Sequence, residues 1–329
     1  MKKAVVAGAG GFIGHHLVSF LKGKQYWVRG VDIKEPEYEK SQSDEFLLLD
    51  LRYWENCLRA TREVDEVYQL AADMGGIGYI STNHAEIAKN NILINTHMLE
   101  ASYQNGVKRY FYSSSACIYP AYKQRSADVV PLKEEDAIPA EPEEGYGWEK
   151  LFAEKLCQYY QEDKRLETRV ARFHNVYGPL GTYEGGREKA PAAICRKVAL
   201  AEDAAEIEVW GDGRQTRSFL YIEDCVEGIY LIAQSDYSKP LNLGSEELVT
   251  IDQLVEMVAK VAGKKVRIKH DLSKPQGVRG RNSDNTKLYS LLGWKPKYSL
   301  LEGLQRTYPW IADRLAQKRK ALQGLNSRL

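Results

Sequence analysis

The stretch AVVAGAGGFIGHHL, residues 4–17, joins a short apolar run to a helical pattern through a glycine-rich turn. Residues 4–10 have the composition of a buried strand that enters a turn. Residues 12–24 place four apolar side chains on one face of a helix, which we expect to stop near Gly23: Ile13, Leu17, Phe20 and Leu21. A strand, a turn and a helix in this order predict the first half of a βαβ unit.

Four further strand-like segments follow in the first half of the chain, separated by longer helical patterns. They are residues 27–33, 44–51, 65–72 and 108–116. Short β-branched runs that alternate with helices are typical of parallel sheets covered on both faces. We therefore predict an α/β fold built on a doubly wound parallel sheet of the Rossmann type.

Composition argues against several classes of function. The 329 residues carry 46 Lys and Arg against 45 Asp and Glu, and we expect no nucleic-acid partner. No apolar run approaches the roughly 20 residues that cross a bilayer, and we expect no membrane contact. Five scattered cysteines fit reduced thiols in the cytoplasm, and no closely spaced set of His, Cys and Asp resembles a zinc site, so we expect no metal.

The glycine-rich turn predicts a dinucleotide site. Gly8, Gly11 and Gly14 follow a GxxGxxG spacing, which permits a tight turn and lets backbone N–H groups at a helix N-terminus approach a diphosphate. Asp32 ends the second strand, where a carboxylate accepts hydrogen bonds from an adenosine ribose and repels a 2′-phosphate. NAD is therefore favoured over NADP, although Lys34 weakens that preference. An isolated match of this spacing is also found in ordinary glycine-rich turns.

Further cofactor contacts are assigned around that turn and at the ends of neighbouring strands: Phe12, Ile13, Asp50, Leu51, Ala71 and Ala72. Asp50 ends the third strand, where a carboxylate could receive an adenine amino group. A solvated carboxylate at a strand end explains the same position equally well.

Tyr146 and Lys150 lie four residues apart in the amphipathic segment EGYGWEKLFAEKLCQYY, residues 144–160. Side chains at i and i+4 share one face of a helix. If that face looks toward a nicotinamide, the Lys150 ammonium and the positive pyridinium both favour the phenolate and lower the tyrosine pKa, so the tyrosine can take a proton from a sugar hydroxyl. An isolated YxxxK pattern is common by chance, and the glycine turn and serine-rich strand that precede this one make it more specific.

At this point the order of the motifs resembles the extended short-chain dehydrogenase/reductase family, which includes nucleotide-sugar epimerases and dehydratases. The matching motifs are Gly8-x-x-Gly11-x-x-Gly14, Asp32, Leu70-Ala71-Ala72, Ser113-Ser114-Ser115, Tyr146-x-x-x-Lys150, Arg172-Phe173-x-Asn175-x-Tyr177-Gly178-Pro179 and Arg217-Ser218-Phe219-x-Tyr221-Ile222-x-Asp224. Residues 284–288 and 292–296 look like the C-terminal signature of that family. The resemblance spans nearly the whole chain and implies NAD as the cofactor.

Several stretches are similar to the members of the family that act on GDP-mannose: AADMGGIGYI, SSSACIYP, ARFHNVYGP, GGREKAPAA, WGDGRQTRSF and GVRGRNSDN. Most sugar epimerases and dehydratases of the family carry threonine or serine where this chain has Cys117, and they lack Lys189. On its own Cys117 would be interpreted as a small core residue, and Lys189 as a solvated cation.

The resemblance implies a reaction on the hexose. Bound NAD transiently oxidises C4, and the new ketone makes the hydrogens on C3 and C5 acidic. Cys117 and Lys189 then exchange protons with those carbons on opposite faces of the ring, which converts GDP-mannose to GDP-L-sugars. Tyr146 takes the C4 hydroxyl proton with the support of Lys150, and Ser115 hydrogen-bonds the C4 oxygen.

A diphosphate substrate calls for cations that keep their charge, so we assign it to Arg217 and Arg281 with support from Lys197. Surface ion pairs are the alternative for these three. Other expected substrate contacts lie in the matching motifs: Gly75, Gly76, Ser115, Ala116, Cys117, Asn175, Glu188, Lys189, Ala190 and Gln215.

Two interleaved lobes are expected. Residues 1–175 and 219–245 form the NAD-binding domain, and residues 176–218 and 246–329 form a smaller α/β lobe that binds the substrate. The basic tail after Asp313 is expected to fray. The resemblance implies a homodimer that pairs through long helices near residues 86–105 and 147–162.

Two other functions stay open. The first is another NAD-dependent nucleotide-sugar 4-epimerase or a 4,6-dehydratase, although a dehydratase should carry an Asp-Glu pair where residues 117–119 are Cys-Ile-Tyr. The second is a non-catalytic NAD-sensing scaffold, although such proteins commonly lose the tyrosine or the lysine.

Overall fold

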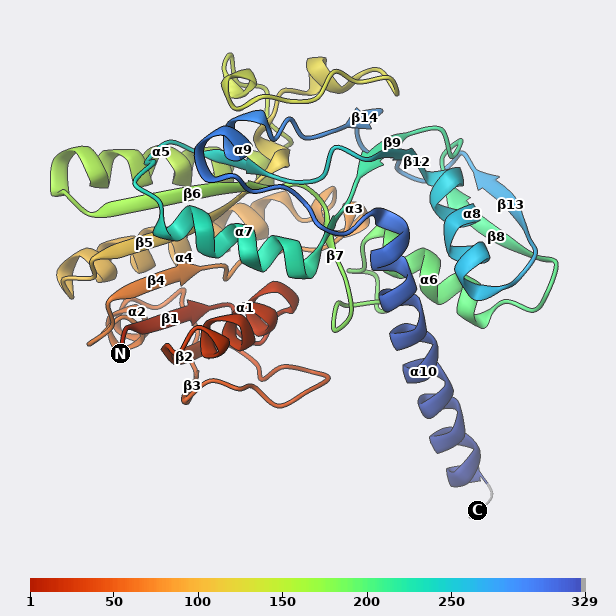
Figure 1. Cartoon of the computed structure of the whole chain (residues 1–329), viewed down its shortest axis with the longest axis horizontal. Coiled ribbons are helices and arrows are strands. Elements are labelled where there is room, and N and C mark those ends of the chain that lie inside the picture. The colour runs from red at the N-terminus through yellow and green to blue at the C-terminus, as the bar shows by residue number, and fades with distance from the viewer. Residues whose placement is uncertain (327–329) are drawn as a thin grey trace.

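A seven-stranded sheet forms the centre of the computed structural model, which describes residues 1–326 (Figure 1). The strand order is β11-β6-β5-β4-β1-β2-β3, and all six pairs are parallel. The strands are β1 Lys3–Ala7, β2 Trp27–Asp32, β3 Glu45–Leu48, β4 Glu66–Gln69, β5 Arg109–Ser115, β6 Glu167–Phe173 and β11 Leu241–Leu243. The predicted doubly wound parallel sheet is confirmed.

Helices cover both faces of this sheet, because its strands carry apolar side chains on both sides. Along β1, Val5 and Ala7 pack with α2, α4 and α5, whereas Ala4 and Val6 belong to the cluster that includes α1 and α7. The helices are α1 Phe12–Gly23, α2 Trp54–Ala60, α4 His84–Gln104, α5 Tyr146–Lys164 and α7 Ile222–Gln234.

The helix predicted from the opening stretch is α1. Leu17 and Leu21 are fully buried against the sheet, and Ile13 and Phe20 are partly buried at its margin. Each fully buried leucine stabilises this contact by about 1.5 to 3 kcal/mol. The helix ends at Gly23, as predicted.

The five strand-like segments of the first half appear as β1 to β5, and the sheet gains two strands beyond them. The chain leaves the sheet after β6, runs through other elements, and returns by α7 to β11, where Leu241 is in register with Ala171. β11 has only three residues, so periodicity alone does not identify it.

Most of the remaining elements lie at one end of the sheet, on the right of Figure 1, whereas the helix α9 Thr286–Leu292 packs beside β11. The elements at that end include the helices α6 Ala190–Leu200, α8 Ile251–Ala262 and α10 Leu300–Asn326, and the strand sets β7 Val176–Tyr177 with β10 Leu220–Tyr221, β8 Ala205–Trp210 with β13 Val266–Asp271, and β12 Leu248–Thr250, β9 Thr216–Ser218 and β14 Gly280–Arg281. Their apolar side chains continue the cluster beneath α1 and α7. The lobe boundaries at residues 175, 219 and 245 stay a prediction.

The tail differs from the expectation. Helix α10 continues to Asn326, and its last turns project from the rest of the protein (Figure 1). The part of the basic tail that the structure describes, up to Asn326, is therefore helical where fraying was expected. Within residues 1–326, no helix combines the length and the apolar composition that a membrane span requires.

Candidate functional site

The carboxyl ends of β1, β4 and β5 meet at one edge of the sheet, where the glycine-rich turn lies. Gly8 has a φ of 86°, and a Cβ added there would lie 2.8 Å from the backbone nitrogen of Ala71. A Cβ on Gly14 would collide with the carbonyl of Gly8. Only glycine fits these two positions, and Gly8 and Gly11 are partly accessible beside the N-terminus of α1. This cradle has the form that a dinucleotide diphosphate requires.

Asp32 lies against the same turn. Its carboxylate accepts the Gly10 N–H at 2.9 Å and the Ile33 N–H at 2.7 Å. Burial raises the pKa of Asp32, and the backbone N–H groups of Lys34, Gly10 and Ile33 oppose that rise. The predicted partner of the adenosine ribose is therefore held at the edge of the diphosphate cradle, and these residues fit NAD.

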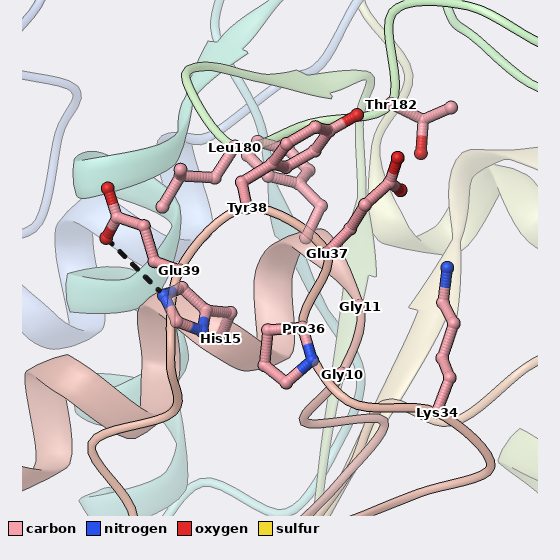
Figure 2. A pocket seen from close by; sticks show the side chains of 11 residues that line it. Gly10, Gly11, His15, Lys34, Pro36, Glu37, Tyr38, Glu39, Leu180 and Thr182 are labelled. Carbon is pink, nitrogen blue, oxygen red and sulfur yellow. Dashed lines mark ion pairs between the residues drawn. The ribbon is translucent and has the colours of Figure 1, made fainter.

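A pocket lies between this turn and the loop that follows β2, and Figure 2 shows its lining. Lys34 and Tyr38 come from the loop, and Leu180 comes from the segment after β7. The Tyr38 ring packs edge-on against Trp310 of α10, with the ring centres 4.9 Å apart, and stacks on Tyr183 at 5.9 Å. The loop over the cofactor edge is thus tied to α10.

The other predicted cofactor residues surround the cradle. Phe12 and Ile13 begin α1, and Ala71 and Ala72 follow β4. Leu51 is buried after β3. Asp50 accepts hydrogen bonds from the backbone N–H and the guanidinium of Arg52, so its carboxylate already has a partner. Its contact with adenine stays a prediction.

Tyr146 and Lys150 lie on the first turn and a half of α5, and both are buried. The Lys150 ammonium donates to the carbonyl of Ser113 at 2.9 Å and lies 5.5 Å from the centre of the Tyr146 ring. Burial raises the pKa of Tyr146 well above its ordinary value, and a hydrogen bond with the Ser115 hydroxyl opposes that rise. The protein alone therefore holds Tyr146 as a phenol. The lowering of its pKa by Lys150 together with the nicotinamide pyridinium stays a prediction.

Glu149 lies between these two residues in sequence and faces α4. Its carboxylate accepts the side-chain amides of Asn91 at 2.8 Å and Asn95 at 3.1 Å. Asn91 also bonds the backbone of Asp73, and Asn95 accepts from Gln69. Burial raises the pKa of Glu149 to about 7, although the Lys150 charge opposes the rise. This buried network joins the catalytic helix to the end of β4.

Cys117 lies in a short 3-10 helix, η1 Ala116–Ile118, directly after β5. Its backbone N–H donates to the Ser115 hydroxyl at 3.2 Å, and its Sγ accepts from Nη1 of Arg281 at 3.5 Å. Burial and the carboxylate of Glu143 raise the pKa of the thiol, while Arg281 and Ser115 oppose that rise. The thiol is thus buried beside Tyr146 with a fixed cation against its sulfur.

Lys189 directly precedes α6 and lies near Cys117. Burial lowers the pKa of its amine, the Cys117 and Cys225 thiols raise it, and Arg281 lowers it. A neutral amine can accept a proton, so burial moves Lys189 toward the state that a base requires. Its neighbour Glu188 touches the glycine pair, since a Cβ on Gly76 would collide with the Glu188 carbonyl. Ala190 begins α6.

The remaining substrate candidates divide into two groups. Arg217 lies near Arg281, and burial followed by the charge of Arg281 lowers its pKa to about 10. Asn175 donates to the carbonyl of Ser218 at 3.1 Å. Gln215 is buried, and its side-chain oxygen has no partner in the described chain, so it can accept from a ligand. Lys197 instead bonds the carbonyl of Glu208 at 2.7 Å, on the far lobe.

Sequence reasoning missed Glu143 and Gln124, which hold Arg281. The guanidinium donates Nη2 to Glu143 and Nε to the side-chain oxygen of Gln124 at 2.7 Å. The only signal for Glu143 is its place three residues before Tyr146. Because α5 begins there, the segment folds back on the backbone of Cys117, whose carbonyl accepts the Glu143 N–H at 2.9 Å.

Comparison with known proteins gives the family. The family model described as "NAD dependent epimerase/dehydratase family" matches residues 4–244, which include Cys117, Tyr146, Lys150 and Lys189. The chain belongs to the NAD-dependent epimerase/dehydratase family. Its cofactor is NAD, which the cradle at Gly8 and the carboxylate of Asp32 fit.

Individual relatives cover nearly all of the chain. GDP-mannose 3,5-epimerase of Arabidopsis thaliana is 50% identical over 321 residues, which make up 97% of this chain and 84% of that protein. UDP-glucose 4-epimerase of Thermotoga maritima, solved with UDP-glucose, matches with a TM-score of 0.86 at 26% identity, over 95% of this chain and 99% of that one. UDP-glucose 4-epimerase of Thermus thermophilus, in complex with NAD, matches with a TM-score of 0.81 at 25% identity, over 94% of this chain and 98% of that one.

Proposed function

We propose that this chain is a GDP-mannose 3,5-epimerase that converts GDP-α-D-mannose to GDP-L-galactose, and to GDP-L-gulose when only C5 is inverted. The observation that carries the proposal is the meeting of a buried thiol, Cys117, and a partly buried amine, Lys189, beside Tyr146. The 50% identity to the Arabidopsis enzyme supports the same substrate.

Tyr146 is the group that acts at the C4 oxygen. When bound, NAD supplies the reversible removal of the C4 hydrogen together with its electron pair. The Tyr146 phenolate accepts the C4 hydroxyl proton on oxidation, and the phenol that results returns the proton on reduction. Ser115 holds the phenol by a hydrogen bond, and the Lys150 charge near the ring stabilises the phenolate while the proton is away.

Cys117 and Lys189 act at the carbons that flank the ketone. A proton on C3 or C5 is acidic there, because the carbanion delocalises onto the C4 oxygen. One group removes the proton from one face of the ring, and the other group delivers a proton to the opposite face. Arg281 favours this exchange, since its guanidinium lies against the sulfur and stabilises a thiolate.

The remaining candidates hold the rest of the substrate. Arg217 and Arg281 provide permanent positive charge for the diphosphate, and the free side-chain oxygen of Gln215 accepts a donor from the nucleoside. Gly75 and Gly76 let backbone approach the sugar, together with Ala116, Asn175, Glu188 and Ala190. Lys197 supports the diphosphate from the far lobe in this proposal.

Heavy water distinguishes this reaction from its closest alternative. A nucleotide-sugar 4-epimerase would use the same Tyr146 and Lys150, but it would leave the hydrogens on C3 and C5 in place. We expect the purified protein with NAD to introduce deuterium from D₂O at both C3 and C5 of GDP-mannose, as read by the mass shift and by NMR. Turnover that introduces deuterium at neither C3 nor C5 would reject the proposal.

A homodimer is part of the proposal, and exposed apolar side chains support it. Trp148, Phe152 and Tyr159 repeat along one face of α5, and each is about half exposed. Ile92 and Leu93 are exposed on α4, which packs beside α5. Large apolar groups gathered on two adjacent helices are typical of a surface that another subunit covers.

Two further proposals concern the environment and the lobes. We propose a cytoplasmic location, which the five free cysteines of the described chain support because reduced thiols are typical of that compartment. We also propose that residues 1–175 and 219–245 bind NAD, while residues 176–218 and 246–329 bind the GDP-sugar. The absence of a metal requirement stays a prediction.

A further inference from the structure

Glu143 connects the buried thiol to an open cleft. Its carboxylate lies beside the Cys117 thiol and pairs with Nη2 of Arg281, whose Nη1 donates to the Cys117 sulfur at 3.5 Å. The same side chain lines a cleft shared with His84, Glu144 and Arg279, and 22% of it is exposed. Cys117 itself is 9% exposed. Glu143 is therefore the ionisable group that touches both the sulfur and the route to solvent.

The stereochemistry of the substrate creates a need for such a group. In the D-mannose ring the hydrogens on C3 and C5 lie on the same face. The base that removes one must therefore remove the other, and the same acid must deliver both new protons. After the first inversion the base holds an extra proton and the acid lacks one. Both groups must be reset before the second inversion.

We propose that Glu143 is the proton relay that resets Cys117 between the two inversions. This inference rests on the proposed function. When Cys117 has removed a carbon-bound proton, its S–H bond breaks, an O–H bond forms on Glu143, and the proton passes to water in the cleft. When Cys117 has delivered a proton instead, the same steps run in reverse and water supplies the proton.

The charges of the site favour this transfer. Before it, the thiol is neutral and the Glu143 carboxylate balances the Arg281 guanidinium. After it, the thiolate balances Arg281 and the Glu143 carboxyl is neutral. The three side chains keep a net charge of zero in both states, so no uncompensated charge is created in the buried site. Arg281 bonds both partners and can stabilise whichever one is negative.

The test compares Glu143→Gln with Glu144→Gln in the enzyme with bound NAD. An amide keeps the hydrogen bond to Arg281 but cannot carry a proton, so Glu143→Gln isolates the relay. We expect the first inversion to stay within about 3-fold of the wild-type rate and the second to fall by about 100-fold, since general acid–base steps contribute on that order. The product then becomes mainly singly inverted. Glu144 lines the same cleft without reaching Cys117, and its variant should keep the wild-type product ratio.

Added formate distinguishes a proton relay at Glu143 from a role in which Glu143 only positions Arg281. A small carboxylate in the open cleft can carry the proton in place of Glu143, so added formate should restore double inversion in Glu143→Gln. An unchanged product ratio in that variant would overturn the relay. An equal loss of both inversions that formate does not restore would overturn it too and leave Glu143 as a support for Arg281. If the wild-type protein inverts neither carbon, the proposed function fails instead.

Discussion

The ammonium of Lys150 lies 5.5 Å from the centre of the Tyr146 ring and 2.9 Å from the carbonyl oxygen of Ser113, with all three groups buried. The carbonyl fixes the ammonium, so Lys150 acts on Tyr146 as a positioned charge. In the proposed mechanism, Tyr146 is therefore the group that exchanges a proton with the substrate. Substitution of Tyr146 and substitution of Lys150 should therefore affect catalysis in different ways.

Tyr146→Phe should remove C4 oxidation, because the ring remains but no group accepts the hydroxyl proton. We expect turnover to fall by about 100- to 10,000-fold, the usual contribution of a general base. The ultraviolet absorbance of reduced nicotinamide after mixing with GDP-mannose measures this step. Tyr122→Phe changes a partly exposed tyrosine away from α5 and should leave the signal unchanged. Wild-type absorbance changes in Tyr146→Phe would assign the proton transfer to another group.

Cys117→Ala should block inversion while it leaves C4 oxidation in place, because in the proposed mechanism the thiol acts at C3 and C5 and Tyr146 acts at C4. We expect deuterium exchange at both carbons to fall by at least about 100-fold. The absorbance of reduced nicotinamide should still rise on addition of substrate. Cys157→Ala removes another buried thiol, one that packs among α4 and α5, and should retain exchange. Full epimerisation by Cys117→Ala would reject the role of the thiol.

Glu149 should make folding depend on pH. Its pKa is 4.5 in the unfolded chain and about 7 in the protein, so the folded state binds the extra proton between these values. The contribution of Glu149 to the free energy of unfolding is therefore complete below pH 4.5. This contribution is lost as the pH rises through 7, and the loss amounts to up to about 3 kcal/mol. Urea unfolding from pH 5 to 8 measures it. In Glu149→Gln, which resembles the protonated form, this part of the decline should disappear. An identical decline in both proteins would contradict the assignment.

The sequence predicted the parts of this protein that local patterns specify. The Gly8 turn, α1 and the strand ends at Asp32 and Ser115 depend on short-range periodicity and on backbone positions that only glycine fits. Those elements appear where they were expected. The sequence assigned residues 219–245 to the NAD-binding lobe but did not identify β11 as a strand. A segment of three residues is too short to show the alternation that marks a strand.

What the sequence could not predict arises from contacts between distant segments. Glu143 gains its place beside Cys117 only because the chain folds back before α5, and Arg281 reaches both from β14. The raised pKa of Tyr146 follows from burial, which a spacing of four residues does not report. The network of Glu149 depends on α4, whose asparagines look like ordinary surface residues in the sequence.

Phe152→Glu should dissociate the proposed dimer. The substitution places a charge at the centre of the exposed apolar face of α5, where a partner would have to bury it. Sedimentation velocity should report a dimer for the wild-type protein and a monomer for the variant. Leu272→Glu changes an apolar residue that is 71% exposed in a loop away from α5, and it should stay dimeric. A wild-type monomer at micromolar concentration would reject the proposed assembly.

Tyr38→Ala should speed the release of NAD. Tyr38 ties the loop over the glycine-rich turn to α10 through the rings of Trp310 and Tyr183. Each aromatic pair contributes about 0.5 to 1.5 kcal/mol, so loss of both should raise the dissociation rate by about 5- to 160-fold. Displacement of bound NAD by a fluorescent analogue measures this rate without turnover. Tyr289→Ala, which removes an exposed ring of α9, is the matched control. Equal release rates in Tyr38→Ala and the wild type would mean that the loop does not retain the cofactor.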